Sequence, residues 1–214
     1  MKDNSTQIAL VLDRSGSMSN VKQATIDSFN EFINGQKLDP NEINLLFVQF
    51  DSDGPHDIVY DGDIKNFQGL TKDNYVPRGM TPLHDAIGWT VTTLGVRLAT
   101  APEDQRPSKV LVVILTDGAE NASHEFNKTS IAALIKEQTD VYKWAFMFLA
   151  ANQDAVLTAE GFNISAGNAL TYNSNDKSLH SMSGSISCTV DLWKYSNSSK
   201  LADFTEKDRE DAAQ

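Results

Sequence analysis

The chain has 214 residues, a length that suits one domain with a single hydrophobic core and at most a short extension. Hydrophobic residues make up 40% and charged residues 22%, which argues against disorder and against a coiled coil. With 18 basic and 29 acidic residues the net charge is −11, so the chain lacks the basic surface of a general nucleic-acid binder and is repelled by anionic membranes. The single cysteine, Cys188, excludes an internal disulfide and a cysteine-rich zinc site.

The distribution of apolar residues indicates a protein outside the membrane. The longest apolar runs, Val110–Leu115 and Trp144–Ala151, fall far short of the ~20 residues that span a bilayer. The N-terminus is polar, and the short apolar stretch after it runs directly into Asp13 and Arg14, which is unlike a signal peptide. We therefore expect a cytoplasmic location.

The first part of the chain is predicted to form buried strands and one helix. Ile8–Leu12 is a continuous apolar run, as expected for a strand that is buried on both faces. Asn20–Gly35 has the apolar spacing of a helix, with Gln23 placed to complete a capping box and a glycine at its end. The following elements are a buried strand at Ile43–Phe50, turns at Asp53–Pro55 and Asp61–Asp63, a short edge strand at Asp57–Tyr60 and a long loop at Ile64–Gly79.

The clearest helix opens at Thr81-Pro82, because proline suits the first helical turn and threonine before it is a natural cap. Its apolar stripe recurs every three or four residues, at Leu83, Ile87, Val91, Leu94 and Leu98. The later elements are a strand at Val110–Leu115, a helix around Ile131–Ile135, a strand at Trp144–Leu149, a short helix at Asp154–Glu160, a strand at Ala169–Tyr172, an amphipathic helix at Leu179–Trp193 and a charged, solvated tail at 201–214. Cys188 lies near the stripe of the last helix and is expected to pack.

Strands that alternate with helices predict an α/β domain over residues 1–200, with an open sheet and helices on both faces. Sites in such sheets form beyond the carboxyl ends of the strands. Two predicted strands end in a carboxylate, at Asp13 and Asp117, and small polar residues follow each of them. If these strands are neighbours, the carboxylates and nearby hydroxyls offer only oxygen ligands. Such a set suits a hard cation, Mg²⁺ first, with Mn²⁺ or Ca²⁺ as alternatives.

These polar residues resemble the metal-ion-dependent adhesion site of the von Willebrand factor type A domain. That site has the pattern Asp-x-Ser-x-Ser, then Thr, then Asp, and this chain fills it in order with Asp13, Ser15, Ser17, Thr81 and Asp117. The three serine and threonine positions and the two aspartates all fall where a strand ends or a helix begins. Alone, the first motif is better interpreted as an Asx turn with a helix cap, but Thr81 and Asp117 together with it favour metal binding. Thr81 also has a structural role available as a helix cap, which is compatible with metal binding.

The resemblance extends from Ile8 to Trp193, because the order of the elements also agrees. It implies a Rossmann-like, mostly parallel sheet of strand order 3-2-1-4-5-6, with Asp57–Tyr60 antiparallel at one edge. The segments Leu115–Asn121 and Ala150–Asp154 look most like the stand-alone type A domains of bacteria and their phages.

The resemblance also implies roles for individual residues. The hydroxyls of Ser15, Ser17 and Thr81 would coordinate the metal, and Asp13 and Asp117 would hold it directly or through water. One coordination position stays open in this family, and an Asp or Glu of a partner protein commonly fills it. The residues expected to shape the rim of the site are Arg14, Met18, His84, Glu120 and Asn121.

The resemblance therefore implies a non-catalytic, Mg²⁺-dependent protein-binding module, of unspecified oligomeric state. One alternative is a metal-independent structural or oligomer subunit, or an inhibitor of a host factor. A metal-dependent phosphohydrolase is disfavoured, because phosphatases of the haloacid dehalogenase type need Asp-x-Asp where this chain has Asp13-Arg14-Ser15. The sequence also lacks a Gly-x-Ser-x-Gly elbow and a phosphate-binding loop. We therefore expect that the protein is not an enzyme.

Overall fold

The computed structural model describes residues 1–54, 56–151 and 154–214. Within them, a single sheet has the strand order β3-β2-β1-β4-β5-β6, which confirms the predicted order. Every pairing is parallel except that of β3 with β2, which is antiparallel at the sheet edge. The strands are β1 (Lys2–Asp13), β2 (Glu42–Phe50), β3 (Asp57–Asp63), β4 (Pro107–Thr116), β5 (Ala145–Ala151) and β6 (Ala169–Tyr172).

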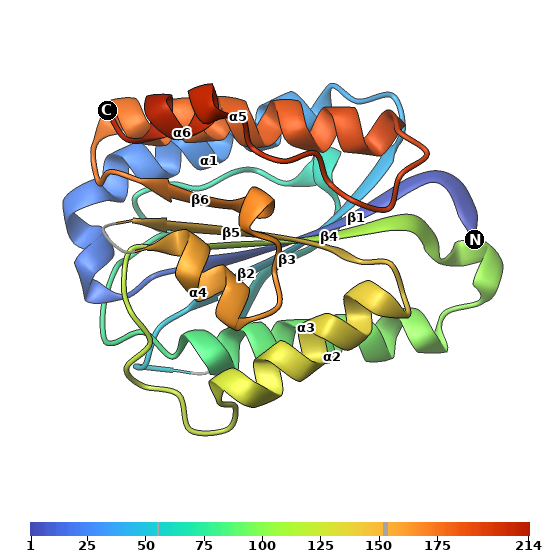
Figure 1. The fold of residues 1–214 in the computed structure, drawn as a ribbon, viewed down its shortest axis with the longest axis horizontal. Coiled ribbons are helices and arrows are strands. Elements are labelled where there is room, and N and C mark those ends of the chain that lie inside the picture. Colours follow the sequence, from blue (N-terminus) through green and yellow to red (C-terminus); the bar gives the residue numbers. More distant parts are fainter. Residues whose placement is uncertain (55, 152–153) are drawn as a thin grey trace.

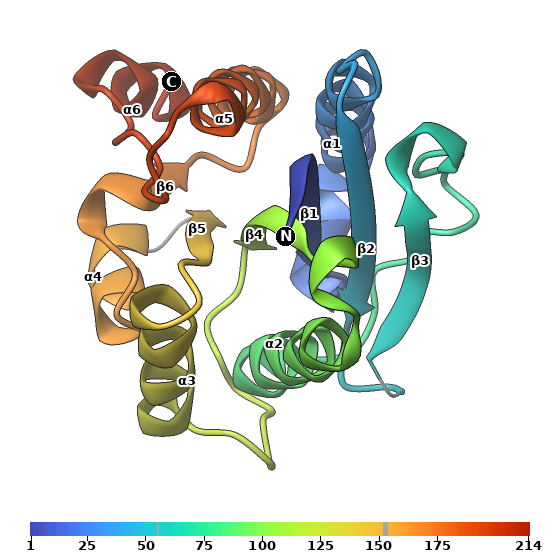
Figure 2. The ribbon, with the colours of Figure 1, turned by 90° about the vertical axis from the view of Figure 1, so that its right-hand side faces the viewer.

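Two layers of helices enclose the sheet (Figure 1). On one face lie α1 (Lys22–Lys37), α5 (Asp176–Tyr195) and α6 (Glu206–Ala212), and on the other lie α2 (Leu83–Thr100), α3 (Lys128–Asp140) and α4 (Ala155–Gly161). Seen along the sheet, β3 and β6 form its two outer edges (Figure 2). This is the predicted α/β architecture, with helices on both faces.

The central strands are apolar throughout because each of their faces has its own core. In β1, Leu10 belongs to the core beneath α1 and α5, and Val11 belongs to the core beneath α2 and α3. Successive side chains of a strand point to opposite faces, so both sets of residues must be apolar. The continuous run at Ile8–Leu12 therefore did indicate a strand at the centre of the sheet.

Local turn signals misplaced two element boundaries. The expected capping box at Asn20 and Gln23 is absent, because residues Gly16–Val21 form a 3-10 turn and α1 begins at Lys22, with Gly35 inside it. The turn expected at Asp61–Asp63 is part of β3, which continues its antiparallel pairing with β2. In both places tertiary pairing and packing outweigh the local preference. The expected turn residue Pro55, and Asn152 and Gln153 within Ala150–Asp154, lie outside the described residues.

The segment 201–214 was expected to be a solvated tail, and the structure corrects this. Leu201, Phe204 and Ala212 are buried, and α6 packs against α5 and β6. Arg209 donates to the carbonyl oxygens of Ala169 (2.8 Å), the first residue of the edge strand β6, and of Ala166 (3.0 Å) in the 3-10 turn before it. The few apolar residues of this charged segment were enough to dock it, because an uncovered strand edge and helix face were available.

Cys188 is exposed on α5, so the expectation that it packs is wrong. Among the described helices, none combines the length and apolar character that crossing a membrane requires.

Candidate metal centre

The carboxyl ends of β1 and β4 meet at one edge of the sheet. The two strands are parallel neighbours, with Leu12 opposite Leu115, so the residues that follow them emerge side by side. Asp13 is the last residue of β1, and Asp117 comes directly after the end of β4. The sequence analysis placed these two carboxylates at one edge on the condition that the two strands are neighbours, and the structure shows that pairing.

Asp13 is fully buried and held from two sides. Its Oδ1 accepts a hydrogen bond from the backbone N–H of Ser15 (2.7 Å), and its Oδ2 accepts one from the hydroxyl of Thr116 (2.6 Å). Burial raises the pKa of the Asp13 carboxyl to about 6, although these hydrogen bonds oppose the increase; the charge of Asp117 adds to it. The carboxylate is thus fixed in direction before any ligand arrives.

A chain of hydroxyls leads from Asp13 to Asp117. The hydroxyl oxygens of Ser15 and Ser17 lie 3.1 Å apart, and Ser17 donates to Oδ1 of Asp117. Burial raises the pKa of Asp117, and the bond from Ser17 lowers it. Ser15 is buried, Ser17 is exposed and Asp117 is partly exposed, so the arrangement opens to solvent on the side of Ser17.

Thr81 completes the set from a third segment of the chain. A Cβ placed on Gly118 would lie 2.8 Å from the Thr81 hydroxyl, too close for a side chain, and 3.6 Å from that of Ser17, an ordinary contact distance. Both hydroxyls therefore lie next to the backbone that follows Asp117, and that of Thr81 crowds it. Only glycine leaves room for this approach. Thr81 does not cap α2 with its side chain, as the sequence had suggested, because Pro82 occupies the N-cap position.

Two of the five expected rim residues point away from the site. The side chain of Arg14 turns inward toward β2 and β3, and Met18 is fully buried in the core beneath α1. Both expectations are wrong, because the loop after β1 folds back on the sheet, so that Gly16 and Ser17 face solvent and these two side chains do not.

His84, Glu120 and Asn121 do lie near the edge, but they hold the backbone in place. The Glu120 carboxylate accepts from the backbone N–H groups of His84 and Ser123, and the Asn121 side chain accepts from the N–H of Thr81 (2.8 Å). The N–H of Asn121 in turn donates to the carbonyl of Thr81 (3.2 Å). Burial lowers the pKa of His84, whose ring lies edge-on to Phe162. These contacts tie the Asp117 loop to the segment that carries Thr81.

Asp85 is a residue that sequence reasoning missed. It lies in the first turn of α2, and its carboxylate accepts from the backbone N–H groups of His124 (2.7 Å), Glu125 (3.0 Å) and Phe126 (2.7 Å). Burial raises the pKa of Asp85, but these three bonds lower it more, so the pKa lies below the ordinary 3.8. An acidic residue in a first helical turn is a common pattern, so only the fold identifies what it binds.

We expect Asp85→Asn to reduce the free energy of unfolding at pH 7 by about 1.5–3 kcal/mol, because hydrogen bonds to a charged acceptor are lost. Since the folded pKa is depressed, this contribution is complete above the ordinary pKa and disappears as the pH falls through the folded value. Urea titrations should therefore show a large difference in the free energy of unfolding between variant and parent at pH 7, and a small difference at about pH 2. Asp73→Asn, at an exposed position, should show none. An equal difference at both pH values would contradict the assignment.

The donor set fits a hard divalent cation. It consists of carboxylate and hydroxyl oxygens. Among the described residues, no three or more His, Cys, Asp or Glu side chains are grouped so that they could hold a metal by themselves. A zinc centre needs nitrogen or sulfur ligands, whereas Mg²⁺ takes oxygens and keeps several waters. The residues that would hold Mg²⁺ here are Asp13, Ser15, Ser17, Thr81 and Asp117.

Comparison with known proteins identifies the family. The family model of the von Willebrand factor type A domain matches residues 7–203, and the chain belongs to this family. No protein of curated function matches the sequence.

Several solved structures share the fold. The von Willebrand factor domain of the type V pili tip protein Mfa5 from Porphyromonas gingivalis aligns with a TM-score of 0.61 and 9% identity, covering 91% of this chain and 97% of that one. The pilus adhesin SpaC from Lactobacillus rhamnosus GG aligns with a TM-score of 0.60 and 14% identity, covering 88% and 30%. Proximal thread matrix protein 1 from the mussel byssus aligns with a TM-score of 0.56 and 16% identity, covering 87% and 47%. The chain thus spans about half the length of the mussel protein.

Proposed function

We propose that this chain is a non-catalytic protein-binding module that captures an acidic side chain of a partner protein through bound Mg²⁺. The observation that carries the proposal is the convergence of three hydroxyl-bearing residues from two segments on the gap between Asp13 and Asp117. Mn²⁺ or Ca²⁺ could replace Mg²⁺, since both accept the same oxygen ligands.

The mixture of ligands explains why such a site would attract a carboxylate. The hydroxyls of Ser15, Ser17 and Thr81 bring no charge, so only the two aspartates neutralise the cation. One of these, Asp13, is buried and faces away from solvent, and the open side is bordered by Ser17. An Asp or Glu of a partner would therefore reach the metal from that side. At a net charge of −11 the chain repels acidic partners at long range, so the bound cation must attract them locally.

The relatives in structure support a binding role over an enzymatic one. SpaC is described as a pilus adhesin and Mfa5 as a pili tip protein, and both contain the fold of this chain. A metal-dependent phosphohydrolase would need a second carboxylate as general acid or base where this chain has Ser15, whose hydroxyl contacts that of Ser17. We propose that the chain serves as an accessory protein of a bacterium or phage. The alternative, a structural subunit or host-factor inhibitor, differs in that its binding would ignore the metal.

Calorimetry with MgCl₂ and MnCl₂ tests the metal site directly, and one bound ion per chain is the expected result. Acetate then serves as a probe of the vacant coordination position. With Mn²⁺ bound, the methyl resonance of acetate should broaden beyond that seen with free Mn²⁺ at the same concentration, and EDTA should reverse the effect. Absence of metal binding would overturn the proposal. Metal binding without any broadening of acetate would contradict the capture of an acid.

A further inference from the structure

Arg14 lies between two of the proposed metal ligands, yet its guanidinium is turned into the protein. Its side chain is only 10% exposed. The Nε donates to Oδ2 of Asp51 (2.6 Å), and Nη2 donates to Oδ2 of Asp57 (2.8 Å). Nη1 contacts the side-chain oxygen of Gln49 at 3.3 Å. The arginine therefore ties the loop after β1 to the ends of β2 and β3.

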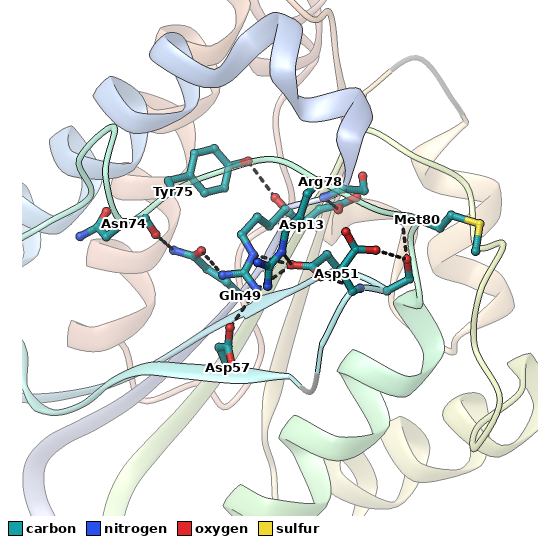
Figure 3. Close-up of polar contacts among 12 residues, drawn as sticks. Asp13, Gln49, Asp51, Asp57, Asn74, Tyr75, Arg78 and Met80 are labelled. Carbon is teal, nitrogen blue, oxygen red and sulfur yellow. Dashed lines mark hydrogen bonds and ion pairs between the residues drawn. The ribbon is translucent and has the colours of Figure 1, made fainter.

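Asp51 is the common partner of two arginines from different segments (Figure 3). It comes directly after β2, and its side chain is fully buried. The Oδ2 that binds Arg14 also accepts from Nε of Arg78 (3.1 Å), and Oδ1 accepts from the backbone N–H of Asp53 (2.8 Å). A buried carboxylate without a cation is costly, so both arginines are held in place by it.

Each arginine belongs to a segment that carries proposed metal ligands. Arg14 is flanked by Asp13 and Ser15, and Arg78 precedes Thr81 by three residues. The backbones of the two segments are also joined directly. The N–H of Arg78 donates to the carbonyl of Arg14 (2.8 Å), and the N–H of Gly16 donates to the carbonyl of Gly79 (3.1 Å). The carboxylate of Asp51 thus clamps these two segments against one another and against β2.

The hydroxyl of Tyr75 strengthens the same junction. It donates to the carbonyl oxygen of Asp13 (2.8 Å), and the tyrosine is fully buried (Figure 3). Gln49 closes the network, because its side-chain amide donates to the carbonyl of Asn74 at 3.2 Å. The backbone of the first ligand loop is therefore fixed relative to the 74–80 segment.

We propose that Asp51, acting through Arg14 and Arg78, is the positioning residue of the metal centre. It sets the separation between the serines that follow Asp13 and the hydroxyl of Thr81. Mg²⁺ demands near-ideal octahedral geometry, so this separation decides how tightly it binds, whereas Ca²⁺ tolerates irregular sites. This inference rests on the function proposed above, since it needs a metal that binds there.

The test is calorimetry of Mg²⁺ and Ca²⁺ binding to the whole chain and its variants. Arg78→Gln should raise the Kd for Mg²⁺ about 10-fold, and Asp51→Asn by about 100-fold, as is usual when groups that orient metal ligands are lost. Both should raise the Kd for Ca²⁺ less than that for Mg²⁺. Arg78→Lys, which keeps a cation beside Asp51, should recover most of the affinity. Circular dichroism and the melting temperature establish that each variant is folded.

Arg97→Gln is the matched control. Arg97 pairs with Asp61 of β3 and donates to Gln7, well away from the carboxyl ends of the strands, with a side chain 35% exposed against 46% for Arg78. Arg97→Gln removes an ion pair of similar exposure, but the substitution should leave the Kd for Mg²⁺ within about twofold of that of the parent. An equal rise for Arg97→Gln would show that general destabilisation is responsible, and would overturn the positioning role.

The remaining outcomes separate this inference from the proposed function. If the parent chain binds Mg²⁺ and Arg78→Gln binds it equally well, Asp51 is not a positioning residue and the metal centre stands. If the parent binds neither Mg²⁺ nor Mn²⁺, the metal centre fails and the positioning role fails with it. Should Asp51→Asn not fold, the half-exposed Arg78 still decides the question, because its removal leaves the pair between Arg14 and Asp51 intact.

Discussion

Asp117→Ala should abolish measurable Mg²⁺ binding and leave the fold unchanged. Asp117 would supply one of two negative charges to the cation, and its loss should weaken binding by about 100-fold or more. Its carboxylate is partly exposed and contacts Ser17, whereas that of Asp13 also holds the backbone at Ser15. The melting temperature of the variant should therefore stay close to that of the parent. Calorimetry with Mg²⁺ measures the loss.

Asp53→Ala is the appropriate control for Asp117→Ala. Asp53 follows β2, and its carboxylate lies close to Gly79 in the segment that leads to Thr81. The substitution therefore removes an exposed negative charge near the site, at the same edge of the sheet. It should retain Mg²⁺ binding. Full retention of Mg²⁺ affinity by Asp117→Ala would place the cation elsewhere and refute the assigned ligand set.

Lys194→Ala should lower the free energy of unfolding by about 3–5 kcal/mol, the usual effect of removing one partner of a buried ion pair. Lys194 on α5 binds Asp39 just after α1, and their side chains are 3% and 4% exposed. Lys194 also donates to the side chain of Gln36 at 2.6 Å. Without the lysine, Asp39 keeps its bond from Tyr195 (2.9 Å) but loses its cation. Urea unfolding, followed by circular dichroism, measures the change.

The control is Lys136→Ala, which removes an exposed pair with Asp140 in α3. There the side chains are 64% and 58% exposed, so the change in unfolding free energy should be below about 0.5 kcal/mol. The double variant Lys194→Ala with Asp39→Ala should be more stable than the sum of the single changes predicts, because no buried charge is left unpaired. Equal effects of the Lys194 and Lys136 changes would contradict the burial of the first pair.

The regular elements were predictable where one physical signal dominated. Buried parallel strands have no polar face, so Val110–Leu115 and the other apolar runs could be read directly as the interior of the sheet. The stripe of α2 was equally clear, since Leu83, Ile87 and Val91 are all buried against the sheet. Element ends were less predictable, because β3 continues through Gly62 to satisfy its pairing with β2 despite an evident turn signal.

The proposed metal ligands could be predicted from the sequence, but the residues that hold the ligand loops in place could not. Asp13 and Asp117 could be placed at one edge because each lies at the carboxyl end of a buried strand, which indicates a parallel sheet. The inward direction of the Arg14 side chain could not be predicted, because its partner Asp51 is 37 residues away in the sequence. For the same reason Asn121, expected at the rim, proved to be bonded to Thr81.

The sequence by itself determined the alternation of strands and helices and the polar residues at the strand ends, because periodicity and hydrophobicity act locally and are visible in one dimension. The strand order followed from the resemblance to the von Willebrand factor type A domain, not from periodicity. Only the tertiary structure decided which of those polar side chains face solvent and which brace the loops. Asp51 and Asp85 each bind groups from distant segments, and the direction of a loop side chain follows from the charge and hydrogen-bond partners that packing brings to it.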